Sequence, residues 1–201
     1  PRHIAERFSL FVLILLGESL LASANAIFGA AGGGARTTQI VMLSVAALVL
    51  AAGVWWIYFS TQSVKLLRDR RSGFVFGYAH FFLFAAVGAL SAGIETELDL
   101  LTGTVAASQS ILVSFALAIP VGMYMLVAWL ILLRRSLPPL GSVLFLLCAA
   151  VALSSGVLPS ATVLACAVAI ALAVAVLERL RRDDGADERR GVDAFGLPRE
   201  Y

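Results

Sequence analysis

The segment that decides the fold reads Phe8-Ser-Leu-Phe-Val-Leu-Ile-Leu-Leu-Gly-Glu-Ser-Leu-Leu-Ala-Ser-Ala-Asn-Ala-Ile-Phe28. As a helix, it is long and apolar enough to cross the roughly 30 Å hydrocarbon layer of a bilayer. Glu18 stands about ten residues into it, or roughly 15 Å along a helix, which is close to the midplane. A carboxylate there costs at least about 2.5 kcal/mol even on insertion scales, so it indicates a partner, a proton or a substrate.

The composition of the whole chain indicates the same class of protein. Of its 201 residues, 60% are hydrophobic and only 14% are charged, a balance that no soluble domain of this size needs. We therefore predict an all-α, polytopic transmembrane helix bundle, with the lipid bilayer as its surroundings. Six spans are expected at residues 8–28, 39–60, 74–94, 106–133, 140–155 and 160–178.

The placement of basic residues predicts the orientation of the spans. The chain has 15 lysines and arginines, and with six spans all of them except Arg36 fall on one side of the membrane. Because cytoplasmic loops carry an excess of Lys and Arg, we expect both termini to be cytoplasmic. Residues 1–180 then form the transmembrane domain, and the charged segment 181–201 is expected to be a disordered cytoplasmic tail.

Aromatic residues and cysteines add two smaller expectations. Trp55, Trp56, Tyr58, Tyr78 and Trp129 fall near the predicted cytoplasmic ends of their helices, where amphipathic rings anchor a protein in the headgroup layer. The two cysteines lie inside apolar stretches without a CxxC motif or a Cys/His cluster. Free buried thiols are therefore expected, and no cofactor or metal site is predicted.

The first span carries a polar stripe. His3, Arg7, Ile14, Glu18 and Asn25 recur at spacings of four and seven residues, so they share one helical face. Inside lipid, such a face must turn toward protein or water. Arg7 is about three turns from Glu18 along the helix and too far for a direct salt bridge.

Glu18 therefore needs a partner from another span, or it is protonated. His80 is the candidate of most interest, since an imidazole exchanges protons near neutral pH. The alternatives remain a neutral Glu18 that serves packing specificity and a His80 that bonds a backbone carbonyl or a headgroup. Glu6 and Arg7 together also fit an ordinary helix start at the membrane edge.

Two further features of the third span lie toward its end. Glu95, Glu97 and Asp99 are expected in a solvated loop, with Glu95 as a candidate to cap the mouth of a cavity. Small residues four apart allow close contact between helices, so they predict a packing interface. They are Gly88, Ala89, Ala92 and Gly93.

The opening His3-Ile-Ala-Glu-Arg-Phe-Ser-Leu-Phe-Val-Leu-Ile-Leu-Leu-Gly-Glu-Ser19 resembles the signature of the bacterial low temperature requirement protein A family, except that Ser9 stands where glycine is usual. Trp55-Trp56-x-Tyr58-Phe59, Tyr78-Ala-His80 and Gly93-x-Glu95 resemble the family too. The resemblance implies an integral bacterial membrane protein, in the cytoplasmic membrane, linked to growth in the cold. It places weight on a polar set of six residues: His3, Glu6, Arg7, Glu18, His80 and Glu95.

Family members are longer, and they carry an earlier motif rich in Glu-x-Phe-Phe-Asp that does not occur here. The resemblance therefore implies that this chain corresponds to the C-terminal half of a member. It also implies that the missing N-terminal half is a partner that could supply the group facing Glu18. The chain opens on Pro1 without a signal-peptide pattern, in keeping with a start at a loop of something longer.

Three functions remain open at this stage. The first is proton-coupled transport of a small solute or ion along a polar path containing Glu18. The second is an intramembrane enzyme in which Glu18 acts as a general acid on a lipid or isoprenoid. No metal motif, nucleophile elbow or cofactor loop supports it, so we lean against an enzyme. The third is a structural or assembly role. Scattered basic loop residues do not indicate nucleic-acid binding.

Overall fold

The computed structural model describes residues 2–30, 37–60 and 70–194. The described residues form α-helices joined by short turns, and no strand occurs among them. The all-α membrane bundle predicted from the composition is confirmed. The six long helices are α1 (Arg2–Ala30), α2 (Thr37–Phe59), α3 (Arg70–Thr102), α4 (Ser110–Ala128), α5 (Pro139–Ser154) and α6 (Thr162–Ala194).

Five of these helical segments are long and apolar enough to cross a membrane, judged on the described residues alone. They are 37–59, 77–102, 107–133, 139–157 and 162–182. The helix α1, with 29 residues, has the length of a span as well. About six spans are therefore plausible, as the sequence predicts.

Three short segments complete the bundle. The 3-10 turns η3 (Ala107–Gln109) and η5 (Ser155–Val157) lead into α4 and out of α5. At its other end, α4 continues into one π-helical turn, η4 (Trp129–Leu133). There the Arg134 amide donates to the Trp129 carbonyl at 2.7 Å, a bond across five residues that widens the helix before it ends.

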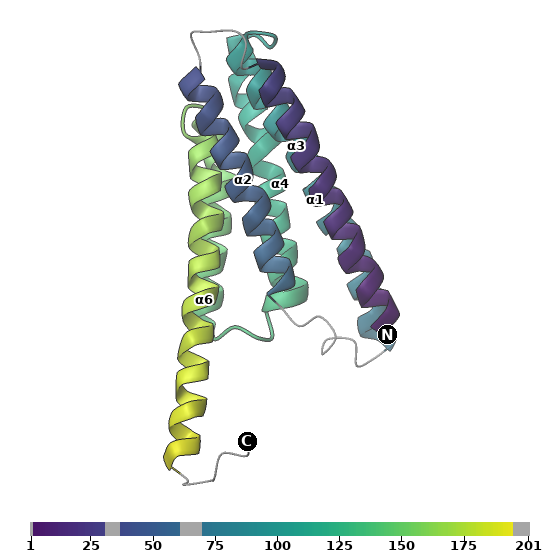
Figure 1. Cartoon of the computed structure of the whole chain (residues 1–201), viewed down its shortest axis with the longest axis vertical. Helices are drawn as coiled ribbons and strands as arrows, with labels where there is room; N and C mark the ends of the chain where they lie inside the picture. The colour runs from purple at the N-terminus through teal and green to yellow at the C-terminus, as the bar shows by residue number, and fades with distance from the viewer. Residues whose placement is uncertain (1, 31–36, 61–69, 195–201) are drawn as a thin grey trace.

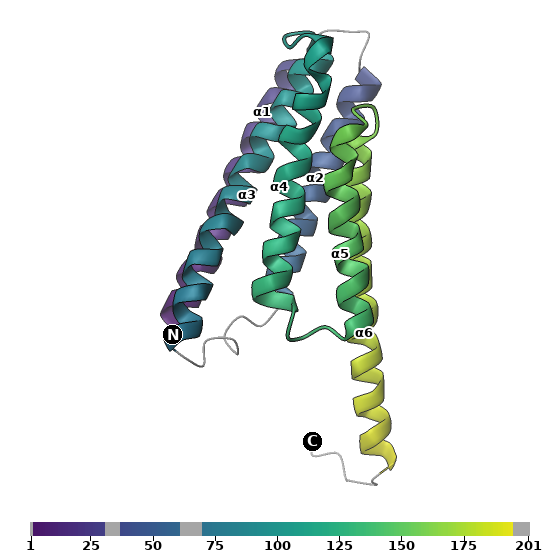
Figure 2. The same cartoon turned by 180° about the vertical axis from the view of Figure 1, so that it is seen from behind.

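Each long helix packs against two or more of the others. The helix α1 packs against α2 and α3, α3 packs most extensively against α4, and α5 packs against α4 and α6. On the other side of the bundle, α2 packs against α6. Figures 1 and 2 show α1 at one edge of the bundle and the α5–α6 pair at the other. One face of α1 is thus left uncovered by the described helices.

The start of α1, the α4–α5 connection and the end of α6 lie at the same end of the bundle (Figure 1). Arg7, Arg134, Arg135 and Arg181 belong to these segments. These segments bring basic residues to one end of the bundle. That both termini are cytoplasmic stays a prediction.

Two helices run further than the sequence pattern predicts. The helix α3 ends at Thr102, whereas the predicted span stops at residue 94. The helix α6 ends at Ala194 and so enters the segment 181–201 that we expect to be disordered. In Figure 1, α6 projects beyond the rest of the bundle.

Candidate functional site

The two faces of α1 have different surroundings. Val12 and Leu16 are buried against the bundle, where α1 meets α2 and α3. The stripe residues Arg7, Ile14 and Glu18 are exposed instead, and Ile14 has 66% of its surface open. The side chains of the other two stripe residues, His3 and Asn25, lie outside the described residues.

Glu18 therefore faces away from the other described helices. The structure records no hydrogen bond or ion pair between its carboxylate and any described side chain. Gly17 beside it is exposed as well, and an added Cβ there would have no atom within 4 Å. The outer face of α1, defined here by Leu10, Ile14, Gly17, Glu18 and Leu21, is thus an apolar surface with one acid in it.

His80 lies on the opposite side of α1, deep in the bundle. It is 0% exposed, and its Nε2 is 3.3 Å from the Tyr58 hydroxyl. The Phe8 ring stacks on the imidazole with centroids 4.7 Å apart and an angle of 14°. The Ser9 side chain also hydrogen-bonds Tyr58. Helices α1, α2 and α3 thus meet in one buried polar and aromatic cluster, formed by Phe8, Ser9, Tyr58 and His80.

This geometry rules out His80 as the partner of Glu18. Phe8 lies directly against the imidazole, and Glu18 follows Phe8 by ten residues, which is about 15 Å along α1. The two groups also lie on different faces of the helix. The expectation that the histidine supplies the partner is therefore corrected: spacing along the sequence gave the depth of Glu18 but not the direction it faces.

Tyr58 also differs from its expected role. It was predicted to anchor the chain in the headgroup layer, yet it is 1% exposed and joined to His80. Trp55, Trp56 and Tyr78 are exposed, as interfacial anchors should be. Tyr58 lies on the face of α2 that packs against its neighbours. Trp129 is half-buried, and its buried Nε1 has no hydrogen-bond partner among the described residues, so two of the five predicted belt residues are not exposed.

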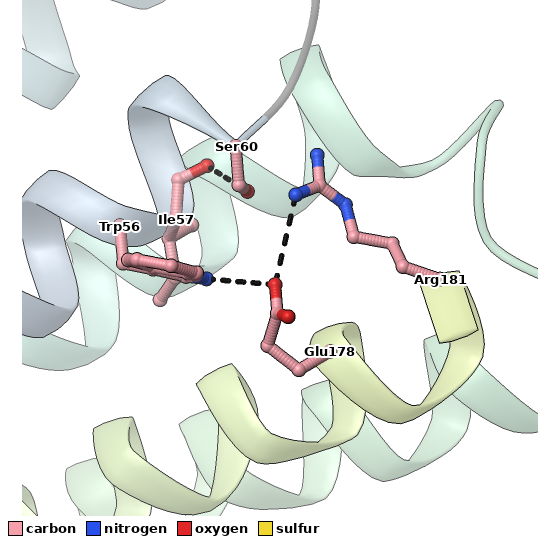
Figure 3. Close-up of polar contacts among 5 residues, drawn as sticks. All are labelled: Trp56, Ile57, Ser60, Glu178 and Arg181. Carbon is pink, nitrogen blue, oxygen red and sulfur yellow. Dashed lines mark hydrogen bonds and ion pairs between the residues drawn. The ribbon is translucent and has the colours of Figure 1, made fainter.

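A small polar contact joins the end of α2 to the middle of α6 (Figure 3). The Trp56 Nε1–H donates to Glu178 Oε1 at 3.1 Å, and the same oxygen is 3.6 Å from the Arg181 guanidinium. Both charged side chains are partly open to solvent, so this ion pair contributes little to stability. The arrangement is that of an interfacial clasp rather than a reaction centre.

The remaining predicted site residues do not converge on His80. Glu6 and Arg7 are exposed at the start of α1, and Glu95 is exposed far along α3. Glu95 follows His80 by about four turns of helix. The candidate set predicted from the sequence is therefore dispersed over the outer face of α1, the interior, and the far part of α3.

The sequence interpretation missed Glu97. It was expected in a solvated loop, but it lies in α3 and is only 5% exposed. A signal for this burial is present in the sequence. Buried residues recur along α3 at alternating spacings of three and four, a typical inward-facing stripe, and Glu97 continues it: His80, Leu83, Val87, Leu90, Ile94 and Glu97.

The small residues of α3 also include both buried and exposed positions. At Gly93 an added Cβ would be 2.7 Å from the Ala116 carbonyl oxygen and 2.9 Å from the Leu117 Cα, so α3 and α4 approach closely there. At Gly88 nothing lies within 4 Å. The predicted packing interface is therefore confirmed at Gly93, whereas Gly88 is exposed. Both cysteines are free, as expected.

Apolar helices of this length, packed around a buried core, define the chain as a multi-pass helical membrane protein. Residues 1–176 match the model of the family described as bacterial low temperature requirement A protein (LtrA). The chain belongs to this family, as its motif on α1 indicates. Neither the curated proteins nor the solved structures contain a match to it.

Proposed function

We propose that the chain forms part of a transporter in the bacterial cytoplasmic membrane, in which Glu18 couples the movement of a small solute or ion to a proton. One observation carries this proposal, namely the exposure of Glu18 on the outer face of α1. The residues around it on that face are Leu10, Ile14 and Leu21, all exposed. They suit lipid or an apolar protein surface equally well, whereas an acid at that depth does not suit lipid.

The outer face of α1 is therefore best explained as a seam with a second protein surface. The resemblance to longer family members implies an N-terminal half, which we propose as the candidate for that surface. In many transporters the substrate and coupling-ion sites lie near the bilayer midplane, where two helical units meet. Glu18 has both properties: it lies about midway along α1 and on a face that is open to another unit.

A flux measurement tests the proton coupling. The protein is reconstituted in vesicles with a pH-sensitive dye inside, and a proton gradient is imposed. Wild-type vesicles should dissipate the gradient faster than protein-free vesicles, and Glu18→Gln should abolish the difference. Glu178→Gln, which removes a carboxylate in the middle of α6, is the matched control and should keep the wild-type rate. An unchanged rate in Glu18→Gln, or no protein-dependent flux, would contradict the proposal.

A structural role remains the second candidate, because the same exposed face would serve assembly without any transport. Gly17 distinguishes the two. A Cβ added there has no atom of the described residues within 4 Å, so Gly17→Leu should leave the fold intact while blocking close approach of a partner. If the role is assembly alone, Gly17→Leu should impair function and Glu18→Gln should not. Growth at low temperature in a strain carrying each variant gives the readout.

A further inference from the structure

The first half of α1 holds this helix against the bundle. Four described side chains of α1 pack against the core: Phe8, Val12, Leu15 and Leu16. Large apolar side chains further along the helix are exposed instead: Leu20, Leu21 and Phe28. Figures 1 and 2 show α1 along one edge of the bundle. Among the described side chains, the contacts that keep α1 in place are therefore concentrated toward its start.

An imidazole lies at the centre of this contact. His80 of α3 is 0% exposed, and three aromatic rings surround it. The Phe8 ring stacks on it at 4.7 Å, while the rings of Tyr58 and Phe84 meet it edge-on at 6.0 and 5.6 Å. We call the imidazole and these three rings the His80 box. Because Phe8 belongs to α1, this helix closes one wall of the box.

One hydrogen bond of the His80 box depends on the protonation state of the imidazole. The Tyr58 hydroxyl lies 3.3 Å from Nε2 of His80. In the neutral tautomer with its proton on Nδ1, Nε2 accepts the hydroxyl proton, whereas an imidazolium has protons on both nitrogens and accepts none. The Tyr58 hydroxyl also bonds Ser9 of α1. Uptake of a proton by His80 therefore disturbs a link in which α1, α2 and α3 all take part.

Burial acts in the same direction as this hydrogen bond. A charged imidazole in the box is removed from water and placed among hydrocarbon rings. The attraction between a cation and a ring face is smaller than the cost of taking an ion out of water. An imidazolium that reaches water bears no such cost, so a proton favours the open form of the box. Since α1 lies at the edge, its displacement opens the box with the least disruption of the other helices.

The elements around the box carry other groups that titrate or bear charge. On α1, Glu6 and Arg7 directly precede Phe8 and are exposed. On α4, the Tyr124 hydroxyl donates to the Val54 carbonyl at 2.6 Å. Arg134 and Arg135, which follow α4, are exposed. Further side chains of this end lie outside the described residues: His3, Lys65, Arg68, Asp69, Arg70 and Arg71.

We propose that the His80 box is an acid-released latch: protonation of His80 detaches the first half of α1 from α2 and α3. Histidine is the side chain whose charge ordinarily changes near neutral pH, so a modest acidification is enough to act on it. The latch changes the position of the helix that carries Glu18, but it does not depend on proton coupling by that residue. Its test therefore requires no transport.

The exposure of a buried position on α1 reports the state of the latch. Val12→Cys and Ile14→Cys are each made in a background with Cys148→Ala and Cys166→Ala. Val12 is 0% exposed and Ile14 is 66% exposed on the same helix, so Ile14→Cys is the matched control. The purified chain in detergent is labelled with dithiodipyridine, which also reacts with thiols in acid. The ratio of the two rates corrects for the effect of pH on the reagent.

The wild-type box should give a step in this ratio. At about pH 8 the Val12→Cys site should react about tenfold or more slowly than the Ile14→Cys site, because labelling then requires a rare local opening. At about pH 5, where an accessible histidine is charged, the two rates should become similar. A ratio that stays constant over this range would overturn the proposal.

Variants of the box assign the step to His80. His80→Gln cannot take up a proton, so its ratio should not change with pH. Tyr58→Phe keeps the histidine but removes the donor to the neutral form, so the midpoint should rise by about half to one pH unit. It gives an independent result if His80→Gln does not fold. Tyr78→Phe removes an exposed hydroxyl two residues from His80 and should leave the midpoint unchanged.

Other titratable groups of α1 serve as controls. The step should persist in His3→Gln, Glu6→Gln and Glu18→Gln. Its loss in any of these would assign the proton to that side chain, and its persistence in His80→Gln would exclude the imidazole; either result overturns the latch. Because labelling does not measure flux, a failure of proton coupling by Glu18 leaves this test unaffected.

Discussion

Glu18 and Glu97 lie on helices that start at the same end of the bundle, yet their carboxylates face opposite ways. Glu18 is exposed on the outer face of α1, in the middle of an apolar span. Glu97 is buried near the far end of α3, in a segment whose several charged residues are typical of a loop. Hydropathy indicates how deep a residue lies in the membrane, but it does not indicate which way the side chain points. That direction decides whether an acid needs another protein surface or a counter-ion inside its own fold.

The largest expected effect concerns the close contact between α3 and α4 at Gly93. Gly93→Leu should lower the free energy of unfolding by about 3 kcal/mol, because the added atoms meet backbone atoms of α4 that cannot move aside. Gly88→Leu is the control on the same helix and should stay within about 0.5 kcal/mol of the wild type, since nothing lies near it. Denaturant titration in mixed micelles measures both. Equal losses would mean that α3 does not face α4 as described.

The second prediction compares the two acids directly in sodium-free buffer at neutral pH. Glu97→Gln should raise the free energy of unfolding by about 1–2 kcal/mol, because the buried oxygen then bears no net charge. Glu18→Gln should change it by less than about 0.5 kcal/mol, because the side chain is exposed in the isolated chain. The same micelle titration applies. A large effect of Glu18→Gln would show that its carboxylate does have a partner in this bundle.

A third prediction concerns the buried cluster that joins α1, α2 and α3. Tyr58→Phe removes the hydroxyl that lies 3.3 Å from His80 Nε2, and should lower the free energy of unfolding by about 1 kcal/mol. Tyr78→Phe removes an equivalent hydroxyl from an exposed ring on α3 and should have no measurable effect. If the two substitutions cost the same, Tyr58 is an interfacial anchor after all.

The smallest effect is expected at the clasp between α2 and α6. Trp56→Phe removes the hydrogen bond from Nε1 to Glu178 Oε1, which is open to solvent and should contribute at most about 0.5 kcal/mol. Trp55→Phe, on the adjacent residue without a recorded hydrogen bond, gives the baseline. Urea or SDS midpoints of the two variants should differ only slightly. A difference above 1 kcal/mol would make this clasp as important as the buried contacts.

The sequence was informative wherever a bilayer imposes a strong constraint. The number, type and approximate limits of the spans follow from runs of about twenty apolar residues, and the motif on α1 identifies the family. The predicted limits of a helix are wrong where the helix continues past its apolar run. The last part of α3 contains three acids close together, a pattern that is typical of a solvated loop: Glu95, Glu97 and Asp99. A helix nevertheless accommodates charge as long as each side chain finds a suitable environment.

The site was harder to predict than the fold, for a physical reason. The polar stripe of α1 shows that Arg7, Ile14 and Glu18 share a face, but periodicity leaves open whether that face meets the bundle. The buried stripe of α3 was equally visible, and following it from His80 through Leu90 leads to Glu97. A charged residue that continues a buried apolar stripe is thus a better indication of an interior site than its depth alone.

The length of α6 has a consequence for anything that approaches the basic end of the bundle. The segment suited to the membrane ends at Arg182, while the helix continues to Ala194, a further 18 Å or so at about 1.5 Å per residue. That extension is slightly more than two Debye lengths, since the Debye length at physiological salt is about 8 Å. Its far tip is therefore electrostatically screened from the lipid headgroups. The extension acts as a spacer that would present residues to the aqueous phase rather than to the bilayer surface.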